Sequence, residues 1–428
     1  MDTIFALATA QGKAGVAVIR VSGPNALEIG ADLTGRALAP RGMCFAELRT
    51  AEGDLLDEAL VLSFSAPNSF TGENIVEFQT HGSSAVVTAL LDALQSTGRA
   101  RLAEPGEFTR RALDNGKLDL TQVEGLADLI DAETEAQRKQ AQVILSGGLG
   151  TLADRWRRDL IRAASLIEVT IDFADEDVPV DVTPEVQALL QGVVTDLAKE
   201  VEGVAIAERV RQGFEVAIIG APNVGKSTLL NALAGRQAAI TSDYAGTTRD
   251  VIEVRMDLDG LPVTLLDTAG LRQTEDHVES IGIGLARDRA EAADLRVFLV
   301  ADDETLDVPF RDGDIRLHPK ADQYGIKAGG VSGKTGQGIE DLVRHVSATL
   351  KNRSAHVGIA TRARHRETLA SAMSSLRQAL SVLSRGPEFY DLAAEDMRSA
   401  IRSLEMLVGR IGVENLLDEI FSSFCLGK

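Results

Sequence analysis

The spacing of apolar residues changes along this 428-residue chain. Residues 1–118 combine short apolar runs rich in β-branched residues, which are typical of strands, with segments whose apolar positions lie three and four apart, as in helices. The predicted strands cover residues 16–21, 59–64 and 75–78, and the predicted helices cover residues 24–33 and 85–94. This first region is therefore predicted to be a mixed α+β domain.

Helical spacing dominates residues 119–210 and returns in residues 353–428. Long runs without proline, such as residues 120–145, carry the pattern, and a further helix is predicted after Pro184, running to about Val210. We predict one all-helical domain made of two halves, with residues 211–352 inserted between them. Such an insertion is tolerated when its two ends lie close together.

The inserted region opens with a pattern that carries chemistry. Residues 214–219 predict a buried strand, and a helix begins at residue 228. Between them lies GAPNVGKS, residues 220–227, which fits the phosphate-binding pattern G-x-x-x-x-G-K-[ST] in its strand–loop–helix context. Backbone N–H groups of such a loop approach phosphate oxygens, Lys226 reaches the terminal phosphates, and Ser227 can ligate magnesium. The alternative is an ordinary glycine turn.

Two further phosphate-facing motifs follow in the expected order. Thr248 lies in AGTTRD, about a helix and a loop beyond the first motif, where it can reach the magnesium and the last phosphate. Two strand-like runs separated by Asp259-Gly260 then form a hairpin signal. The second run leads to DTAG, in which Asp267 can hold the metal through water and Gly270 can turn toward the phosphate. Together the motifs predict a P-loop GTPase domain of the Ras-like kind.

Leu271 follows DTAG at the position where Ras-like GTPases carry the glutamine that orients the attacking water. A leucine cannot hydrogen-bond to water, so another group must organise hydrolysis. Glu279 lies just beyond the motif and can position water directly or through a second water. Arg249 and Arg272 are candidate charge donors, although solvated surface arginines explain them equally. Asn223 offers a side-chain oxygen that suits a monovalent cation, or it only stabilises the loop.

Base recognition is predicted at Pro319-Lys320-Ala321-Asp322, which follows a strand at residues 296–300. Guanine-specific GTPases carry N-K-x-D here, and the aspartate accepts hydrogen bonds from the ring N–H and amino group of guanine. Asp322 is present, but Pro319 cannot supply the asparagine's side-chain bonds, so we expect weaker nucleotide binding with the choice of base retained. Ser332-Gly333-Lys334 is the expected last base-contacting loop. The alternative for residues 319–322 is an unrelated loop, in which case guanine selectivity is lost.

Composition narrows the class of protein. Hydrophobic residues make up 44% of the chain and aromatic residues 4%, so separate aliphatic cores are expected. No run approaches the roughly twenty apolar residues of a membrane span, and the first ten residues lack the features of a signal peptide, so we expect a cytoplasmic protein without membrane insertion. Cys44 and Cys425 suggest no disulfide framework. The net charge of −20 argues against a general polyanion binder.

Any RNA contact therefore needs a local basic patch or a partner protein. Arginines cluster at residues 155–162 and at residues 361–366, although solvated arginines paired with nearby acids explain such clusters as well. His81 lies between a predicted strand and a predicted helix, at a corner that suits an anion. It is either a turn or capping residue or a catalytic base, and the turn or capping role is favoured.

The quoted motifs resemble one family. GAPNVGKS, GTTRD, DTAGLR and LLNALAGR are similar to the GTPase domain of the MnmE (TrmE/ThdF) family of tRNA-modification GTPases. In residues 1–118, GVAVIRVSGP, PNSFTGE, EFQTHG, EPGEFTRRA and NGKLDLTQ also resemble that family, as does the final Cys-Leu-Gly-Lys. The resemblance implies a folate-binding and dimerisation domain at 1–118, a helical domain at 119–210 and 353–428, and a GTPase domain at 211–352.

The resemblance also implies roles for individual residues. Glu279, Lys226 and Asn223 would serve GTP hydrolysis, and Cys425 the modification chemistry. Ser227 and Thr248 would ligate magnesium, and potassium would be held by Asn223, Ser242, Tyr244 and Thr247. Formyl- or methylene-tetrahydrofolate would be bound by Arg20, Glu77, Lys117 and Lys428. The residues implied in GTP binding are Asn223, Val224, Gly225, Lys226, Ser227, Thr228, Ser242, Asp243, Tyr244, Ala245, Gly246, Thr247, Thr248, Asp267, Thr268, Ala269, Gly270, Lys320, Asp322, Ser332, Gly333 and Lys334.

The expected protein is a homodimeric GTPase that forms a heterotetramer with a flavin-containing MnmG-type partner. With it, the family adds a carboxymethylaminomethyl-type group to the 5-position of the wobble uridine of certain tRNAs, using a folate one-carbon unit. Two other classes share the phosphate motifs: a ribosome-assembly or regulatory GTPase of the Era or EngA kind, and a nucleotide-binding scaffold with weak turnover.

Overall fold

The computed structural model describes residues 2–172, 181–221, 223–235, 253–267, 288–289, 291–300, 308–354 and 358–412, together with residues 417, 420, 421, 424 and 427. The chain divides into two compact units, Met1–Ala127 with Glu405–Lys428, and Asp128–Leu404. Within the described part, no helix combines the length and the apolar character that crossing a membrane requires.

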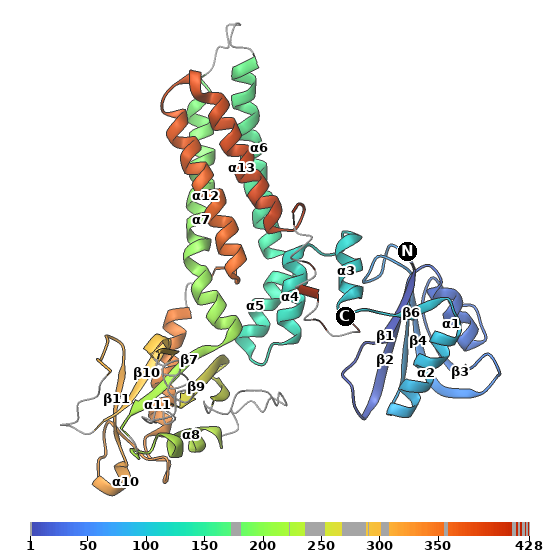
Figure 1. Cartoon of the computed structure of the whole chain (residues 1–428), viewed down its shortest axis with the longest axis horizontal. Coiled ribbons are helices and arrows are strands. Elements are labelled where there is room, and N and C mark those ends of the chain that lie inside the picture. Colours follow the sequence, from blue (N-terminus) through green and yellow to red (C-terminus); the bar gives the residue numbers. More distant parts are fainter. Residues whose placement is uncertain are drawn as a thin grey trace, which may run out of the picture. The chain divides into compact units, whose positions relative to one another are not determined.

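A six-stranded sheet organises the first unit (Figure 1). Its strand order is β3-β4-β5-β2-β1-β6, and all neighbours are antiparallel except β1 and β6. Helices α1 (Ala26–Thr34) and α2 (Ser84–Ser96) share one core with the sheet and so cover the same face. The strands are β1 (Thr3–Leu7), β2 (Ala14–Ser22), β3 (Arg41–Arg49), β4 (Leu55–Phe64), β5 (Ile75–Gly82) and β6 (Ala100–Leu102).

Side chains alternate across each strand, and this alternation assigns residues to the two faces of the sheet. Ile19 and Val21 of β2 are buried in the core under α1 and α2, so Arg20 between them points to the opposite face. Phe108 of helix α3 (Glu107–Asp114) lies close to the Arg20 guanidinium, which places α3 on that opposite face. Basic and aromatic side chains therefore meet away from the main core.

The predicted strands β2, β4 and β5 and the predicted helices α1 and α2 are confirmed, with bounds that differ by a few residues. Strands β1 and β3 were not predicted. Strand β3 lies at the edge of the sheet and reads RGMCFAELR, in which Met43 and Phe45 are 69% and 63% exposed. Apolar residues on both faces obscure the period of two from which a half-buried strand is predicted.

The second unit contains a bundle of long helices (Figure 1). Helix α7 (Thr183–Gln212) packs against α6 (Gly148–Asp172) and α12 (Ala363–Leu383), and Arg398 of α13 (Tyr390–Leu407) pairs with Glu168 of α6. The helical run predicted at 120–145 is two helices, α4 (Leu120–Ile130) and α5 (Glu135–Leu145). A capping box between Thr134 and Gln137 starts α5, because these side chains satisfy backbone N–H groups at the helix end.

The GTPase domain is inserted between α7 and α12, two helices that pack against each other. Its sheet has the order β12-β11-β10-β7-β9-β8, parallel except for the edge strand β8. The carboxyl ends of the parallel strands share one edge, where ligands bind in open α/β sheets. The strands are β7 (Phe214–Gly220), β8 (Glu253–Leu258), β9 (Leu261–Asp267), β10 (Leu295–Leu299), β11 (Ile315–Pro319) and β12 (Gly330–Val331), and the helices are α8 (Lys226–Ala234), α10 (Ala321–Tyr324) and α11 (Ile339–Arg353).

Candidate functional site

The phosphate loop follows the central strand β7 and leads into α8, as predicted. Asn223 and Gly225 have positive φ angles, 60° and 113°, which turn the backbone sharply ahead of the helix. Lys226 is 5% exposed, and its Nζ donates hydrogen bonds to the carbonyls of Gly220 at 2.7 Å and Ala221 at 2.9 Å. The ammonium group is therefore held over the loop on which phosphates would lie.

Ser227 and Asp267 meet at the carboxyl ends of β7 and β9. The Ser227 hydroxyl donates to Asp267 Oδ2 at 2.9 Å, and Asp267 is 5% exposed. A hydroxyl and a carboxylate are hard oxygen ligands, and magnesium typically binds one or two such groups beside substrate phosphates. The two residues fit a magnesium site next to the phosphate loop.

A cavity of about 160 Å³ joins the phosphate loop to the predicted base-binding segments. Val224, Gly225, Thr228 and Leu229 come from the phosphate loop and α8. The remaining lining residues come from β10, from the ends of β11 and β12 and from the segments after them: Leu299, Pro319, Lys320, Asp322, Gln323, Val331, Ser332, Gly333 and Lys334. The structure thus brings together all of the base-binding residues that were predicted from sequence.

Direct backbone contact fixes one wall of this cavity. A Cβ atom on Gly333 would lie 2.6 Å from the Thr228 carbonyl, so the loop after β12 touches the first turn of α8. The backbone N–H of Thr335 donates to the Ser332 hydroxyl at 3.2 Å and closes a turn in this loop. The last base-contacting loop and the phosphate loop therefore form one packed surface.

Several predicted site residues lie outside the described residues. They are Ser242, Asp243, Tyr244, Ala245, Gly246, Thr247, Thr248, Thr268, Ala269, Gly270, Glu279, Cys425 and Lys428. Arg249, Leu271 and Arg272 also lie there. Their predicted roles stay predictions.

The first unit pairs two of the predicted folate-binding residues. Arg20 on β2 and Glu77 on β5 are register partners, and Arg20 Nε lies 2.8 Å from Glu77 Oε1. The guanidinium carbon of Arg20 is 5.3 Å from the ring centroid of Phe70 and 5.7 Å from that of Phe108. Lys117 is exposed and lies beside Gly72. Aromatic rings thus flank a charged pair on the sheet face away from α1 and α2.

The C-terminal tail returns to this domain. Phe421 and Phe424 pack with Val123, and Gly427 lies so close to β1 that a Cβ atom on it would be 2.1 Å from the Leu7 carbonyl. Only a residue without a side chain fits there, which explains the glycine in the final Cys-Leu-Gly-Lys.

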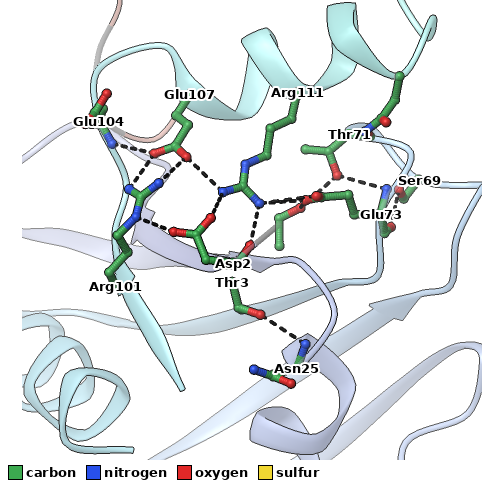
Figure 2. A network of polar contacts seen from close by, with 12 residues as sticks. Asp2, Thr3, Asn25, Ser69, Thr71, Glu73, Arg101, Glu104, Glu107 and Arg111 are labelled. Atoms are coloured by element: carbon green, nitrogen blue, oxygen red, sulfur yellow. Dashed lines mark hydrogen bonds and ion pairs between the residues drawn. The ribbon is translucent and has the colours of Figure 1, made fainter. Parts of the chain in front are cut away.

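A network of charged residues in the first unit was not predicted (Figure 2). Arg111 of α3 is 7% exposed and donates to the Asp2 carbonyl at 2.7 Å, to Asp2 Oδ1 at 2.8 Å and to Glu107 Oε1 at 2.8 Å. Glu73 also contacts Arg111, at 3.1 Å, and Arg101 binds Glu107 through two hydrogen bonds. The network ties the N-terminus to α3, and the repeated charges of EPGEFTRRA are the signal that could have indicated it.

Other sequence candidates have structural partners. His81 lies within strand β5, not in the turn that was predicted from the sequence. Its Nδ1 lies 2.8 Å from Asp57 Oδ1, and its backbone N–H donates to Asp57 Oδ2. Burial would raise the pKa of the Asp57 carboxyl, but hydrogen bonds from His81 outweigh it and lower that pKa.

The predicted basic clusters are also paired. On α6, Arg155 pairs with Asp196 and Arg162 with Glu185. In residues 361–366, Arg362 pairs with Asp128 at 2.6 Å, and His365 is fully buried. These observations favour the structural interpretation of both clusters over an RNA contact.

Comparison with known proteins decides which family of GTPases this is. The family model described as "MnmE helical domain" matches residues 120–425, and that described as "GTP-binding protein TrmE N-terminus" matches residues 3–117. The tRNA modification GTPase MnmE of Ruegeria sp. (strain TM1040) is 76% identical over 428 residues, which cover 100% of both chains. The chain belongs to the MnmE family of tRNA modification GTPases.

A second MnmE relative, from Ruegeria pomeroyi, is 63% identical, again over 100% of both chains. Among solved structures, Era in complex with MgGDPNP and part of 16S ribosomal RNA is 26% identical over 32% of this chain and 56% of that chain, with a TM-score of 0.25. As an MnmE-family enzyme, this protein is a GTPase that acts in tRNA modification. The relatives matched over their full length give no support to a ribosome-assembly role.

Proposed function

We propose that this MnmE-family GTPase works with a flavin-containing MnmG-type partner on the wobble uridine of certain tRNAs. Together they add a carboxymethylaminomethyl-type group to the 5-position of the base, with a one-carbon unit held as formyl- or methylene-tetrahydrofolate. GTP hydrolysis is the conformational switch that drives the GTPase domains of a homodimer together.

The Arg20–Glu77 pair is the observation that carries the folate proposal. The two side chains lie 2.8 Å apart on the face of the first sheet that carries α3, with Phe70 and Phe108 beside them. A carboxylate suits the N–H-rich edge of a pterin ring, arginine suits a carboxylate or formyl oxygen, and aromatic rings suit a flat heterocycle. Lys117, and Lys428 at the end of the chain, complete the proposed set.

The GTPase site is proposed to work with the following division of roles. Lys226 and the loop amides bind phosphate, Ser227 and Thr248 ligate magnesium, and Asp267 supports the metal through water. Magnesium, when bound, supplies positive charge against the charge that develops on the phosphate oxygens. The 2.9 Å contact between Ser227 and Asp267 supports this part of the proposal.

Three further roles in the GTPase site are proposed. Asp322 selects guanine over adenine, because the carboxylate accepts from groups that adenine lacks. Glu279 positions the attacking water. Asn223, Ser242, Tyr244 and Thr247 hold potassium, and the phosphate-loop position of Asn223 supports this assignment.

A homodimer through the first unit is part of the proposal. Strand β3 forms an edge of the sheet, and Met43 and Phe45 expose most of their surface there. Exposed apolar side chains on an edge strand mark a surface that another chain covers. A second copy on this face would also lie near the Arg20–Glu77 pair, because β3, β4, β5 and β2 are consecutive in the sheet.

Mass spectrometry of wobble nucleosides tests the proposal. Cells that lack the protein are complemented with the wild-type chain, with Arg20→Met or with Arg344→Met, in which the replaced arginine is exposed on α11 and pairs with Asp341. We expect the modified uridine to disappear in the deletion strain, to return with the wild type and Arg344→Met, and to stay absent with Arg20→Met.

Unchanged wobble nucleosides in the deletion strain would contradict the proposed reaction. Full restoration by Arg20→Met would agree with the proposed reaction but would contradict the proposed folate site. Co-purification of a flavoprotein with the wild-type chain tests the partner separately.

A further inference from the structure

The base loop of this chain lacks the side chain that ordinarily fixes it. Pro319 ends β11, pairs with Val331 of β12 and is buried in the wall of the 160 Å³ cavity. A proline side chain has no polar atom, and its nitrogen has no hydrogen to donate. Another contact must hold Asp322 in place.

The backbone beyond Pro319 adopts a conformation that needs support. Lys320 has φ 52° and ψ 43°, in the left-handed region that non-glycine residues rarely occupy. Helix α10, which carries Asp322, follows directly and is only four residues long. Such a conformation persists when the surrounding structure determines it, because it is strained at a residue that carries a Cβ atom.

Gln337 supplies that support from the neighbouring loop. Its Nε2 donates to the Ile326 carbonyl, just beyond α10, at 2.6 Å, and its own carbonyl accepts from the Ser332 N–H at 2.9 Å. One residue thus joins the segment that carries Asp322 to the loop that carries Ser332 and Gly333.

The connection continues to the phosphate loop. Gly333 is in backbone contact with Thr228, in the first turn of the helix that begins with Lys226. Contacts therefore run from α8 through Gly333 to Gln337 and from there to α10. In N-K-x-D proteins the asparagine side chain makes a tie of this kind, but here it comes from the loop after β12.

We propose that Gln337 is a positioning residue that holds Asp322 in register with the guanine base and takes over the task of the missing asparagine. The inference rests on the proposed role of Asp322 in reading the base. Gln337 does not line the cavity itself, so it acts through α10 rather than by touching the nucleotide.

The ratio of GDP affinity to IDP affinity isolates this role. IDP lacks the 2-amino group that would donate a hydrogen bond to Asp322, so the ratio measures that contact. General damage to the domain would weaken the binding of both nucleotides equally. The experiment uses the full-length chain with magnesium and measures dissociation constants by displacement of a fluorescent nucleotide. The variants are Gln337→Leu, which removes the donor and is one bond shorter, and Thr335→Ala as a control in the same loop.

We expect the wild type and Thr335→Ala to prefer GDP, and Gln337→Leu to lose about tenfold of that preference, as for one hydrogen bond to a charged group. Adding Pro319→Asn to Gln337→Leu should restore the preference. A Gln337→Leu variant that keeps the full preference, or that loses affinity for GDP and IDP by the same factor, would overturn the inference. A wild type with no preference would instead overturn the proposed role of Asp322.

Discussion

Three non-glycine residues with positive φ angles occur in the described part of the chain: Asn223, Asp259 and Lys320. Two of them lie at the nucleotide cavity, one in the phosphate loop and one in the base loop. Left-handed conformations cost free energy at residues that carry a Cβ atom, and they persist where the surrounding structure requires them. The surrounding structure thus determines the backbone conformation of the phosphate loop at Asn223 and of the base loop at Lys320.

Replacing Pro319 by asparagine is expected to raise the affinity for GTP. In Pro319→Asn, one or two side-chain hydrogen bonds would return to the base loop, each contributing about 1 kcal/mol. We expect GTP to bind roughly five to thirty times more tightly, with slower dissociation, in an equilibrium titration against the wild type. An unchanged dissociation constant would show that the loop does not contact the nucleotide as proposed.

At the scale of elements, the β8–β9 hairpin links strand β9, which ends at Asp267, to two helices. Its turn is Asp259-Gly260, as predicted from the sequence, and both residues have positive φ. The Gly260 carbonyl accepts from Ala136 at the start of α5, and Asp259 Oδ2 accepts from Ser347 Oγ of α11 at 2.8 Å. The strand that ends at Asp267 is thereby anchored at its far end.

Substitutions at Asp259 separate the backbone requirement from the side-chain contact. Asp259→Ala removes the bond to Ser347 and places a Cβ residue in the left-handed region without local hydrogen bonds, which costs about 1–2 kcal/mol. Asp259→Asn keeps an oxygen acceptor and tolerates this conformation, so its cost should be at most about half as large. Thermal unfolding of both variants measures the difference, and equal melting temperatures would contradict the proposed anchoring.

The charge network of the first unit makes its stability depend on pH. Burial would raise the pKa of the Glu107 carboxyl, but hydrogen bonds from Arg101, the Glu104 backbone and Arg111 outweigh it and hold that pKa below its ordinary value of 4.5. A carboxyl with a lowered folded-state pKa contributes stability above its unfolded pKa and loses that contribution as the pH falls through the folded value.

We therefore expect the melting temperature of the wild type to decrease as the pH is lowered below about 4.5. In Glu107→Gln, which cannot ionise, the melting temperature should be lower near neutral pH and should change less steeply in acid. Melting curves of the full chain between neutral and acid pH check this. Parallel curves for the two proteins would contradict a role for Glu107 in the pH dependence.

At the scale of the whole molecule, the parts that sequence analysis predicted best are those with local rules. Phosphate and base motifs follow strand ends, so their meeting at one edge of a parallel sheet could be predicted from strand order alone. The inserted GTPase domain was likewise predicted from the change between two hydrophobic periods. The structure confirms the insertion, and it brings the segments after β7, β11 and β12 to one cavity.

Contacts between residues far apart in sequence could not be predicted. The pairing of Arg111 with Asp2 spans 109 residues, and the contact of Gly427 with Leu7 joins the two ends of the chain. Strand β3 was missed because its exposed Met43 and Phe45 obscure the alternation. These features depend on tertiary packing, for which a single sequence carries no periodic signal.

The proposed hydrolysis mechanism depends on Glu279, because Leu271 cannot position water. Glu279→Ala should lower the rate of GTP hydrolysis by about a hundredfold or more, as for loss of a residue that positions or activates water. GTP affinity should stay close to that of the wild type. Single-turnover hydrolysis checks the rate, and a rate near that of the wild type would assign the water to another group.

The central claim is that a triphosphate site without the Ras-type glutamine is made competent by potassium and by the facing subunit of a dimer. The rate of GTP hydrolysis by the wild-type chain in potassium chloride and in sodium chloride of equal ionic strength tests it most directly. We predict a rate at least about tenfold higher in potassium, with dimerisation of the GTPase domains in the same salt. Equal rates in the two salts from a chain that stays monomeric would contradict the claim.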